Sequence, residues 1–141
     1  MSLWSPRDAR GEPEGLILFD GVCVFCSRWV RFVIDRDPQA RFSFTPIQSE
    51  RGRALAERLG IDPEAPQTNA VIWNGRAWFK SDAALTVLGE LEETRSLAKL
   101  KAVPRLVRDP VYDLIARHRY RIFGRTEVCM VPSAAVRARF T

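Results

Sequence analysis

The sequence contains no long hydrophobic run. No part of its 141 residues approaches the roughly 18 uninterrupted apolar residues that a membrane-spanning helix needs. Residues 1–8 also lack the apolar segment of a secretory signal peptide. Cysteine is scarce, and its three residues are too few for the disulfide framework of a small secreted protein. We therefore expect a cytoplasmic protein without a membrane span, in which closely spaced cysteines serve redox chemistry, catalysis or metal binding.

Internal repeats and low-complexity tracts are also lacking, and the composition is that of a single globular domain. The net charge of +5 is uneven, because residues 1–94 carry −3 and residues 95–141 carry +8. A basic end of this kind is typical of a solvated helix face, and it also suits a weak contact with an anionic surface. Arginines and aromatics interleave over residues 117–125, but no recognised nucleic-acid motif accompanies them, so we predict no nucleic-acid partner.

Hydrophobic patterning predicts alternating strands and helices over residues 15–95. Residues 16–19 form an apolar run that ends at a turn signal, which predicts a buried strand. Apolar residues then recur with helical spacing over residues 22–37, and alternation over residues 41–46 predicts a second strand. A further helix is expected over residues 49–59, with a serine cap at its start and a glycine after its end.

A β-hairpin is predicted next. Two strand-like runs, residues 70–73 and 76–79, flank Asn74-Gly75, and this dipeptide is the strongest short-range hairpin signal. Ser81 is then expected to cap another helix. The resulting order, β-α-β-α-β-β-α, is the thioredoxin-like arrangement of a mixed α/β sheet with helices on its faces.

Both ends of the chain are expected to lie outside this core. Residues 1–14 are rich in charge, proline and glycine, which predicts a flexible leader. Residues 96–141 predict a basic helical extension that packs on the core, with a short helix ending at Pro104 and a longer helix that has Pro110 in its first turn. We expect the core to cover an apolar stripe of the longer helix, formed by Val111, Leu114, Ile115, His118 and Ile122.

A Cys-x-x-Cys pair, Cys23 and Cys26, stands at the start of the first predicted helix. The spacing alone serves zinc as readily as disulfide exchange, but the position between a buried strand and a helix favours redox chemistry. The N–H groups at a helix N-terminus stabilise a thiolate. We expect Cys23 to be the exposed, low-pKa thiolate that attacks a substrate disulfide, and Cys26 to be the shielded thiol that resolves the mixed disulfide.

This chemistry needs no cofactor beyond the two cysteines. Its partners would be a disulfide or dithiol substrate and an electron donor, neither of which the sequence identifies. Asp20, three residues before Cys23, has two interpretations. Its carboxylate either accepts backbone N–H groups in a short turn or relays a proton to or from a cysteine.

A structural metal site is the main alternative to redox chemistry. Cys23, Cys26, Cys129 and His118 together would make a Cys₃His zinc set. His118 lies in the middle of a predicted apolar helix stripe, where a hydrogen-bonded core histidine is the more common outcome. We therefore predict no metal ligand, and we interpret Cys129 as a buried thiol or as a third redox thiol.

The residues Asp20-Gly21-Val22-Cys23-Val24-Phe25-Cys26 carry the Asp-x-x-Cys-x-x-Cys signature that gives the DCC family its name, and the chain resembles this family of thiol–disulfide oxidoreductases. The resemblance extends from about Leu16 to Phe140. It implies a thioredoxin-like fold and a disulfide oxidoreductase role for Cys23 and Cys26, with Asp20 beside them. Separate matches include Gln48-Ser49, the helix start at residues 81–85, residues 108–112 and the closing Cys129-x-x-Pro132.

One feature of thioredoxins themselves is missing. Thioredoxins place a cis-proline just before the strand that faces the cysteine pair. In this chain Gln67-Thr68-Asn69 occupy that place, and Pro66 comes slightly earlier. The sequence therefore does not predict a proline clamp for substrate.

Overall fold

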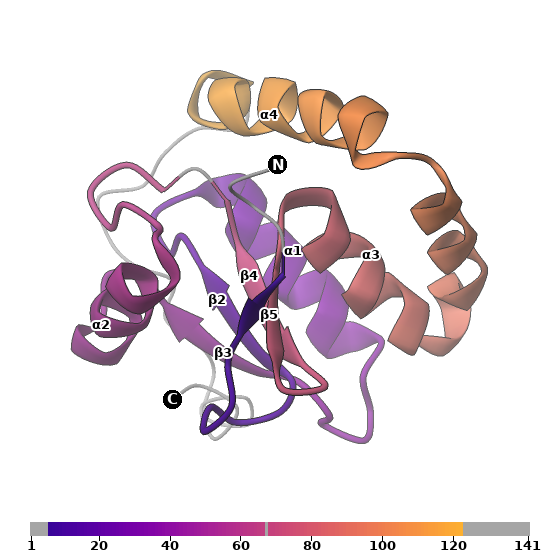
Figure 1. Cartoon of the computed structure of the whole chain (residues 1–141), viewed down its shortest axis with the longest axis horizontal. Helices are drawn as coiled ribbons and strands as arrows, with labels where there is room; N and C mark the ends of the chain where they lie inside the picture. Colours follow the sequence, from indigo (N-terminus) through magenta and orange to yellow (C-terminus); the bar gives the residue numbers. More distant parts are fainter. Residues whose placement is uncertain (1–5, 67, 123–141) are drawn as a thin grey trace.

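The computed structural model describes residues 6–66 and 68–122 of the chain. They form a five-stranded mixed sheet in the order β1-β5-β4-β2-β3, flanked by helices on both faces (Figure 1). A long helix near the end of the described chain, α4 (Arg105–Ile122), crosses one end of the sheet at the top of that view. The site discussed below lies between this helix and the sheet.

The strand pairing follows the predicted order. β2 (Leu16–Phe19) lies inside the sheet, between parallel β3 (Ser43–Pro46) and antiparallel β4 (Ala70–Trp73). β4 then pairs with β5 (Arg76–Phe79) through a two-residue turn. Both turn residues have a positive φ, as a type I′ hairpin turn requires. A βαβ unit followed by a hairpin confirms the thioredoxin-like α/β fold.

Helices cover both faces of the sheet, which explains why every residue of β2 is apolar and buried. Alternate residues of a strand point to opposite faces. Ile17 packs in the core formed with α1 (Val24–Asp35) and α3 (Lys80–Glu90). Leu18 packs in the opposite core, formed with α2 (Glu50–Leu59). β2 therefore joins two hydrophobic cores.

The described part of the predicted leader is more ordered than we expected. Arg7–Asp8 form β1, an antiparallel edge strand on β5, and Ala9 is fully buried. Residues 1–5 lie outside the described part of the chain. The charge and proline content of this segment predicted a flexible leader, and a strand of two residues is too short to show an alternating pattern.

The helical extension differs from its prediction at several points. Residues 92–102 form a 3₁₀ helix, η1 (Glu92–Ala102), and α4 already begins at Arg105. Pro110 therefore lies inside α4, because the Pro104 carbonyl accepts the N–H groups of residues 107 and 108 and starts the helix earlier. The apolar stripe is not covered as expected, since Val111, Leu114 and Ile115 are exposed. The side chain of Ile122 and all of residues 123–141 lie outside the described part.

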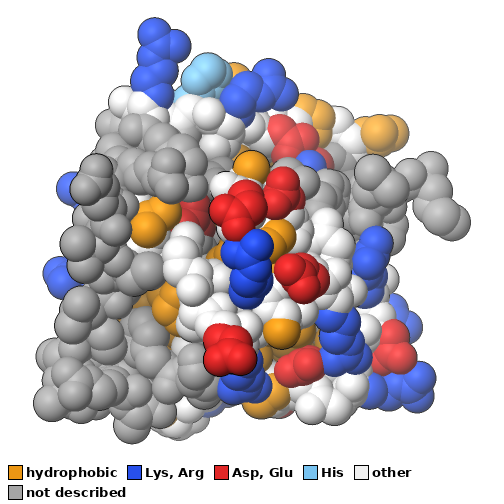
Figure 2. Space-filling view, turned by 90° about the vertical axis from the view of Figure 1, so that its left-hand side faces the viewer, with side chains coloured by type: hydrophobic (Ala, Val, Ile, Leu, Met, Phe, Trp, Pro, Cys, Tyr) orange, Lys and Arg blue, Asp and Glu red, His pale blue; other side chains and the backbone are white. Residues whose placement is uncertain are grey.

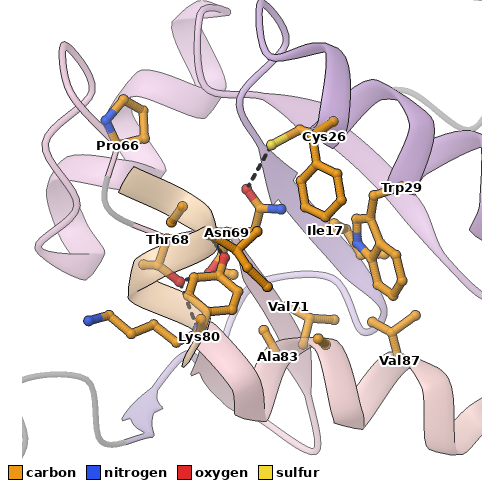
Figure 3. A pocket seen from close by; sticks show the side chains of 16 residues that line it. Ile17, Cys26, Trp29, Pro66, Thr68, Asn69, Val71, Lys80, Ala83 and Val87 are labelled. Atoms are coloured by element: carbon orange, nitrogen blue, oxygen red, sulfur yellow. Dashed lines mark hydrogen bonds between the residues drawn. The ribbon is translucent and has the colours of Figure 1, made fainter. Parts of the chain in front are cut away.

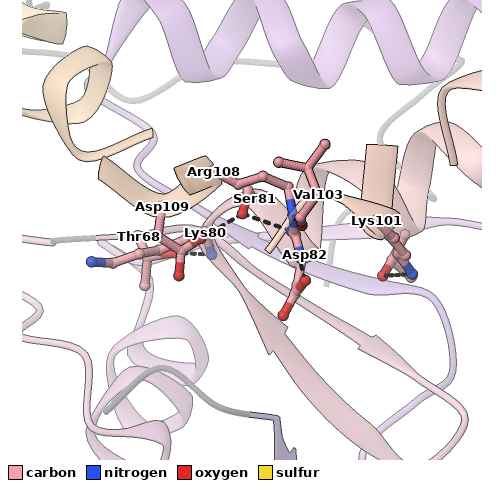
Figure 4. Close-up of polar contacts among 9 residues, drawn as sticks. Thr68, Lys80, Ser81, Asp82, Lys101, Val103, Arg108 and Asp109 are labelled. Atoms are coloured by element: carbon pink, nitrogen blue, oxygen red, sulfur yellow. Dashed lines mark hydrogen bonds and ion pairs between the residues drawn. The ribbon is translucent and has the colours of Figure 1, made fainter. Parts of the chain in front are cut away.

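Polar side chains attach α4 to α3 (Figure 4). Arg108 forms a 2.9 Å ion pair with Asp82 and donates to the Ser81 hydroxyl at 2.9 Å. Lys80 pairs with Asp113 at 2.6 Å. Ser81 is thus not the helix cap that we predicted: Phe79 occupies the N-cap position, and Ser81 lies in the first turn of α3 and holds α4. Apolar periodicity could not reveal an attachment of this kind.

The Arg108–Asp82 pair gives a stability prediction. Both side chains are largely buried, so Arg108→Gln leaves the Asp82 carboxylate charged without its cation. We expect the free energy of unfolding, measured by urea denaturation, to fall by about 3 kcal/mol. Arg117→Gln, at an exposed position of the same helix, is the control and should change it by less than about 0.5 kcal/mol. Equal effects of the two substitutions would contradict this account of how α4 is held.

Candidate functional site

The two cysteines occupy the first turn of α1. Cys23 is the N-cap residue, and its sulfur accepts a hydrogen bond from the backbone N–H of Cys26 at 3.4 Å. Its carbonyl accepts the Ser27 N–H at 3.0 Å, which begins the helical hydrogen-bond series. The sulfur of Cys23 therefore lies at a helix N-terminus, where N–H groups favour a negative charge.

The expected difference in exposure between the cysteines is wrong. Cys23 is 0% exposed and Cys26 is 4% exposed, and both belong to the core that α1 and α3 form on the sheet. Of the two, Cys26 and not Cys23 lines the cavity beside the site. Helical spacing places a residue on one side of a helix, but it does not show what other elements pack over that side.

Asp20 is buried in the turn between β2 and α1. Its Oδ1 accepts the Val22 N–H at 3.2 Å and the Gln48 side-chain amide at 2.7 Å. The side-chain oxygen of Gln48, Oε1, accepts the Gly21 N–H at 2.8 Å, so the Gln48 amide bridges both parts of the turn. The turn interpretation of Asp20 is thus confirmed. Sequence reasoning did not give Gln48 a role, although it follows β3, whose carboxyl end lies beside that of parallel β2.

Asn69 faces Cys26 from the residues that lead into β4 (Figure 3). The Cys26 thiol donates to Asn69 Oδ1 at 3.8 Å, a long contact to a weak donor. The Asn69 N–H donates to the Tyr112 hydroxyl of α4 at 3.2 Å. Thr68 fixes the same segment, because its hydroxyl donates to the backbone carbonyl of Asn69 at 2.6 Å and accepts the backbone N–H of Lys80 at 2.7 Å. An amide side chain thus lies opposite the thiol.

A cavity of about 230 Å³ lies beside Cys26. Its walls come from α1, β4, α3 and α4, and most of the side chains are apolar (Figure 3). Asn69, Thr68 and Lys80 supply polar groups on one side, and Lys80 is held by its ion pair with Asp113. The apolar walls include Phe25, Trp29, Val71, Val87, Ile115 and Ala116.

The zinc alternative depends on a residue that the structure does not describe. Cys129 lies outside residues 6–66 and 68–122. Within those residues, no three histidine, cysteine or acidic side chains form a group suited to a metal ion. His118 is half-buried on α4, near exposed basic side chains that Figure 2 shows at the top of the molecule. Acidic and basic side chains otherwise intermingle on the face seen in that view.

Comparison with known proteins relates most of the chain to one family. A family model described as DCC1-like thiol-disulfide oxidoreductase matches residues 17–125. "Uncharacterized protein YuxK" of Bacillus subtilis (strain 168) is 40% identical over 129 residues, which cover 91% of this chain and 94% of that protein. "DCC family protein At1g52590, chloroplastic" of Arabidopsis thaliana is 35% identical over 120 residues, covering 84% of this chain and 70% of that protein.

No solved structure matches the chain significantly. Among the described residues, no helix is long and apolar enough to cross a membrane. The family match covers most of the chain and contains both cysteines, Asp20, Gln48 and Asn69. The chain therefore belongs to the DCC1-like thiol-disulfide oxidoreductase family.

Proposed function

We propose that the protein exchanges two electrons between dithiols and disulfides through Cys23 and Cys26. The observation that carries this proposal is the 3.4 Å contact from the Cys26 N–H to the Cys23 sulfur. It holds both residues in one helical turn and gives the Cys23 sulfur a donor that stabilises a thiolate. The match to the DCC1-like thiol-disulfide oxidoreductase family supports the same chemistry.

In the proposed reaction the enzyme alternates between a Cys23–Cys26 disulfide and the dithiol form. Two substrate thiols reduce the enzyme disulfide and become one substrate disulfide, and the reverse reaction reduces a substrate disulfide. The cysteines themselves carry both electrons, so no further cofactor is proposed. A second dithiol or disulfide compound restores the starting form. We place this reaction in the cytoplasm, since a chain with only three cysteines has no disulfide framework that needs an oxidising compartment.

We also propose that Asp20 exchanges a proton with the cysteine pair. The carboxylate is buried, and the Cys23 N–H donates to its backbone carbonyl at 3.2 Å, so the acid and the thiol share one turn. The Gln48 amide and the Val22 N–H fix the orientation of the carboxylate. A buried acid in a fixed orientation can take the proton that a cysteine loses when it becomes a thiolate.

Formation of the Cys23–Cys26 disulfide is the first test. The full chain is equilibrated with mixtures of reduced and oxidised dithiothreitol, quenched with an alkylating reagent and mapped by mass spectrometry. We expect Cys23 and Cys26 to lose reactivity together in one two-electron transition, with a tenfold change in their ratio over about 30 mV. Either single serine substitution should abolish the transition, whereas Cys129→Ser should retain it.

Two results would contradict the redox proposal. One is a pair of thiols that remain alkylatable across the whole range of potentials. The other is stoichiometric zinc in protein purified without chelator, with loss of the fold when the zinc is removed. The second result would establish the metal-binding alternative.

Asp20→Asn tests the proton role separately from the turn role. The amide oxygen can still accept the bonds from Val22 and Gln48, so we expect a wild-type melting temperature. The rate of disulfide exchange should fall about 100-fold. Asp20→Ala, which removes the acceptor, should lower the melting temperature as well. A wild-type exchange rate for Asp20→Asn would leave Asp20 as a turn residue only.

A further inference from the structure

Only one cysteine of the pair lines the cavity. Cys26 lines the cavity, whereas Cys23 is fully buried and is not part of its wall. Cys23 instead directs its sulfur back to the start of α1, where it accepts the Cys26 N–H. Thiol–disulfide exchange depends on which sulfur an incoming group can reach. The geometry therefore separates the sulfur that is accessible from the sulfur that the helix stabilises.

The cavity has the size and surface of a site for a small apolar group. A dry cavity of about 150 Å³ in a protein core is large enough to bind benzene. The cavity beside Cys26 measures about 230 Å³, and Phe25 and Trp29 stand next to the cysteine in its wall. The nearby cation of Lys80 is already neutralised by Asp113 at 2.6 Å. The walls thus favour an uncharged, apolar body over a charged one.

We propose that this cavity is the substrate site, that it takes a low-molecular-weight thiol or disulfide with an aromatic or aliphatic body, and that Cys26 is the sulfur that forms the mixed disulfide. The inference rests on the proposed redox function of the pair. It names the substrate class and reverses the order of the two cysteines that the sequence suggested. Asn69 supplies a polar group of the same wall, and its Oδ1 lies 3.8 Å from the Cys26 sulfur.

The steps balance as follows when a substrate thiol is oxidised. A substrate thiolate attacks the Cys26 sulfur of the enzyme disulfide, the Cys26–Cys23 bond breaks, and Cys23 leaves as a thiolate. A second substrate thiolate attacks the substrate sulfur of the mixed disulfide, which releases the substrate disulfide and the Cys26 thiolate. The two protons lost by the substrate thiols end on Cys23 and Cys26. Two electrons have then passed from substrate to enzyme.

The helix start assists the first of these steps. A thiol that is stabilised as a thiolate leaves faster in disulfide exchange. The Cys26 N–H that donates to the Cys23 sulfur stabilises that leaving group. In the reverse direction the same Cys23 thiolate attacks the mixed disulfide on Cys26 and expels the substrate. In both directions, therefore, Cys26 forms the bond to substrate, and Cys23 forms or breaks the bond within the enzyme.

Methanethiosulfonate reagents of two kinds test the proposal. They transfer an RS group to a thiol and release methanesulfinate, so reagents that differ only in R compare the fit of R. The full chain carrying Cys23→Ser is labelled at Cys26 with benzyl methanethiosulfonate and with 2-sulfonatoethyl methanethiosulfonate, and the ratio of the two rates is taken. We expect this ratio to be about tenfold higher or more in the folded protein than in the urea-unfolded protein. With the same benzyl reagent, Cys23 in the Cys26→Ser variant should react at least about tenfold more slowly than Cys26 does in the Cys23→Ser variant. Peptide mapping distinguishes label on Cys129 from label on Cys23 or Cys26.

A blocked cavity is the matched test. Ala116→Phe fills the cavity from α4, and in the Cys23→Ser background it should remove the preference for the benzyl reagent. Ala102→Phe, at an exposed position at the end of η1, should retain it. Circular dichroism confirms that each variant is folded, and Ala84→Phe, which fills the cavity from α3, replaces Ala116→Phe if that variant does not fold.

Three results would overturn the proposal: faster labelling of Cys23 than of Cys26, equal normalised rates for the benzyl and sulfonatoethyl reagents, or an unchanged benzyl preference in a folded, cavity-filling variant. None of them bears on whether the Cys23–Cys26 disulfide forms. The dithiothreitol titration decides that question separately, so a failure of the substrate proposal is distinguishable from a failure of the redox function.

Discussion

The backbone N–H of Cys26 donates to the sulfur of Cys23, and this single contact ties the chemistry to the fold. It exists because α1 begins after the short turn that follows β2, so that the cap residue of the helix is also the first cysteine. Burial of β2 between two cores fixes where that helix starts. Cys23 is removed from solvent, and of the two cysteines it is Cys26 that lines the cavity.

The helical extension completes the site instead of merely covering the domain. α4 supplies the Tyr112 hydroxyl that accepts the Asn69 N–H, and Tyr112 and Ala116 form part of the cavity wall. Its position depends on charged and hydroxyl side chains on α3, above all the buried pair between Arg108 and Asp82. A helix attached by polar contacts can leave apolar residues exposed, as α4 does at Leu106, Val107, Val111 and Leu114.

Much of the fold could be predicted because it follows from local patterns. The apolar run of β2, the serine cap and glycine stop of α2, and the Asn74-Gly75 turn are each encoded within a few residues. Two of the errors share one cause. The edge strand β1 and the start of α3 at Lys80 depend on partners distant in sequence, β5 and the Thr68 hydroxyl. Periodicity carries no information on such partners.

The sequence by itself determined the thioredoxin-like order of elements and the position of Cys23 and Cys26 at a helix start, because spacing and neighbouring residues are enough to set both. Only the tertiary structure decided which cysteine meets a cavity, what lies opposite it and what holds Asp20. Gln48 bonds to the turn and Asn69 to the Cys26 thiol, while the Tyr112 hydroxyl accepts the Asn69 N–H; the three residues come from separate segments. Contacts of this kind arise when strands and helices pack, and no local pattern specifies them.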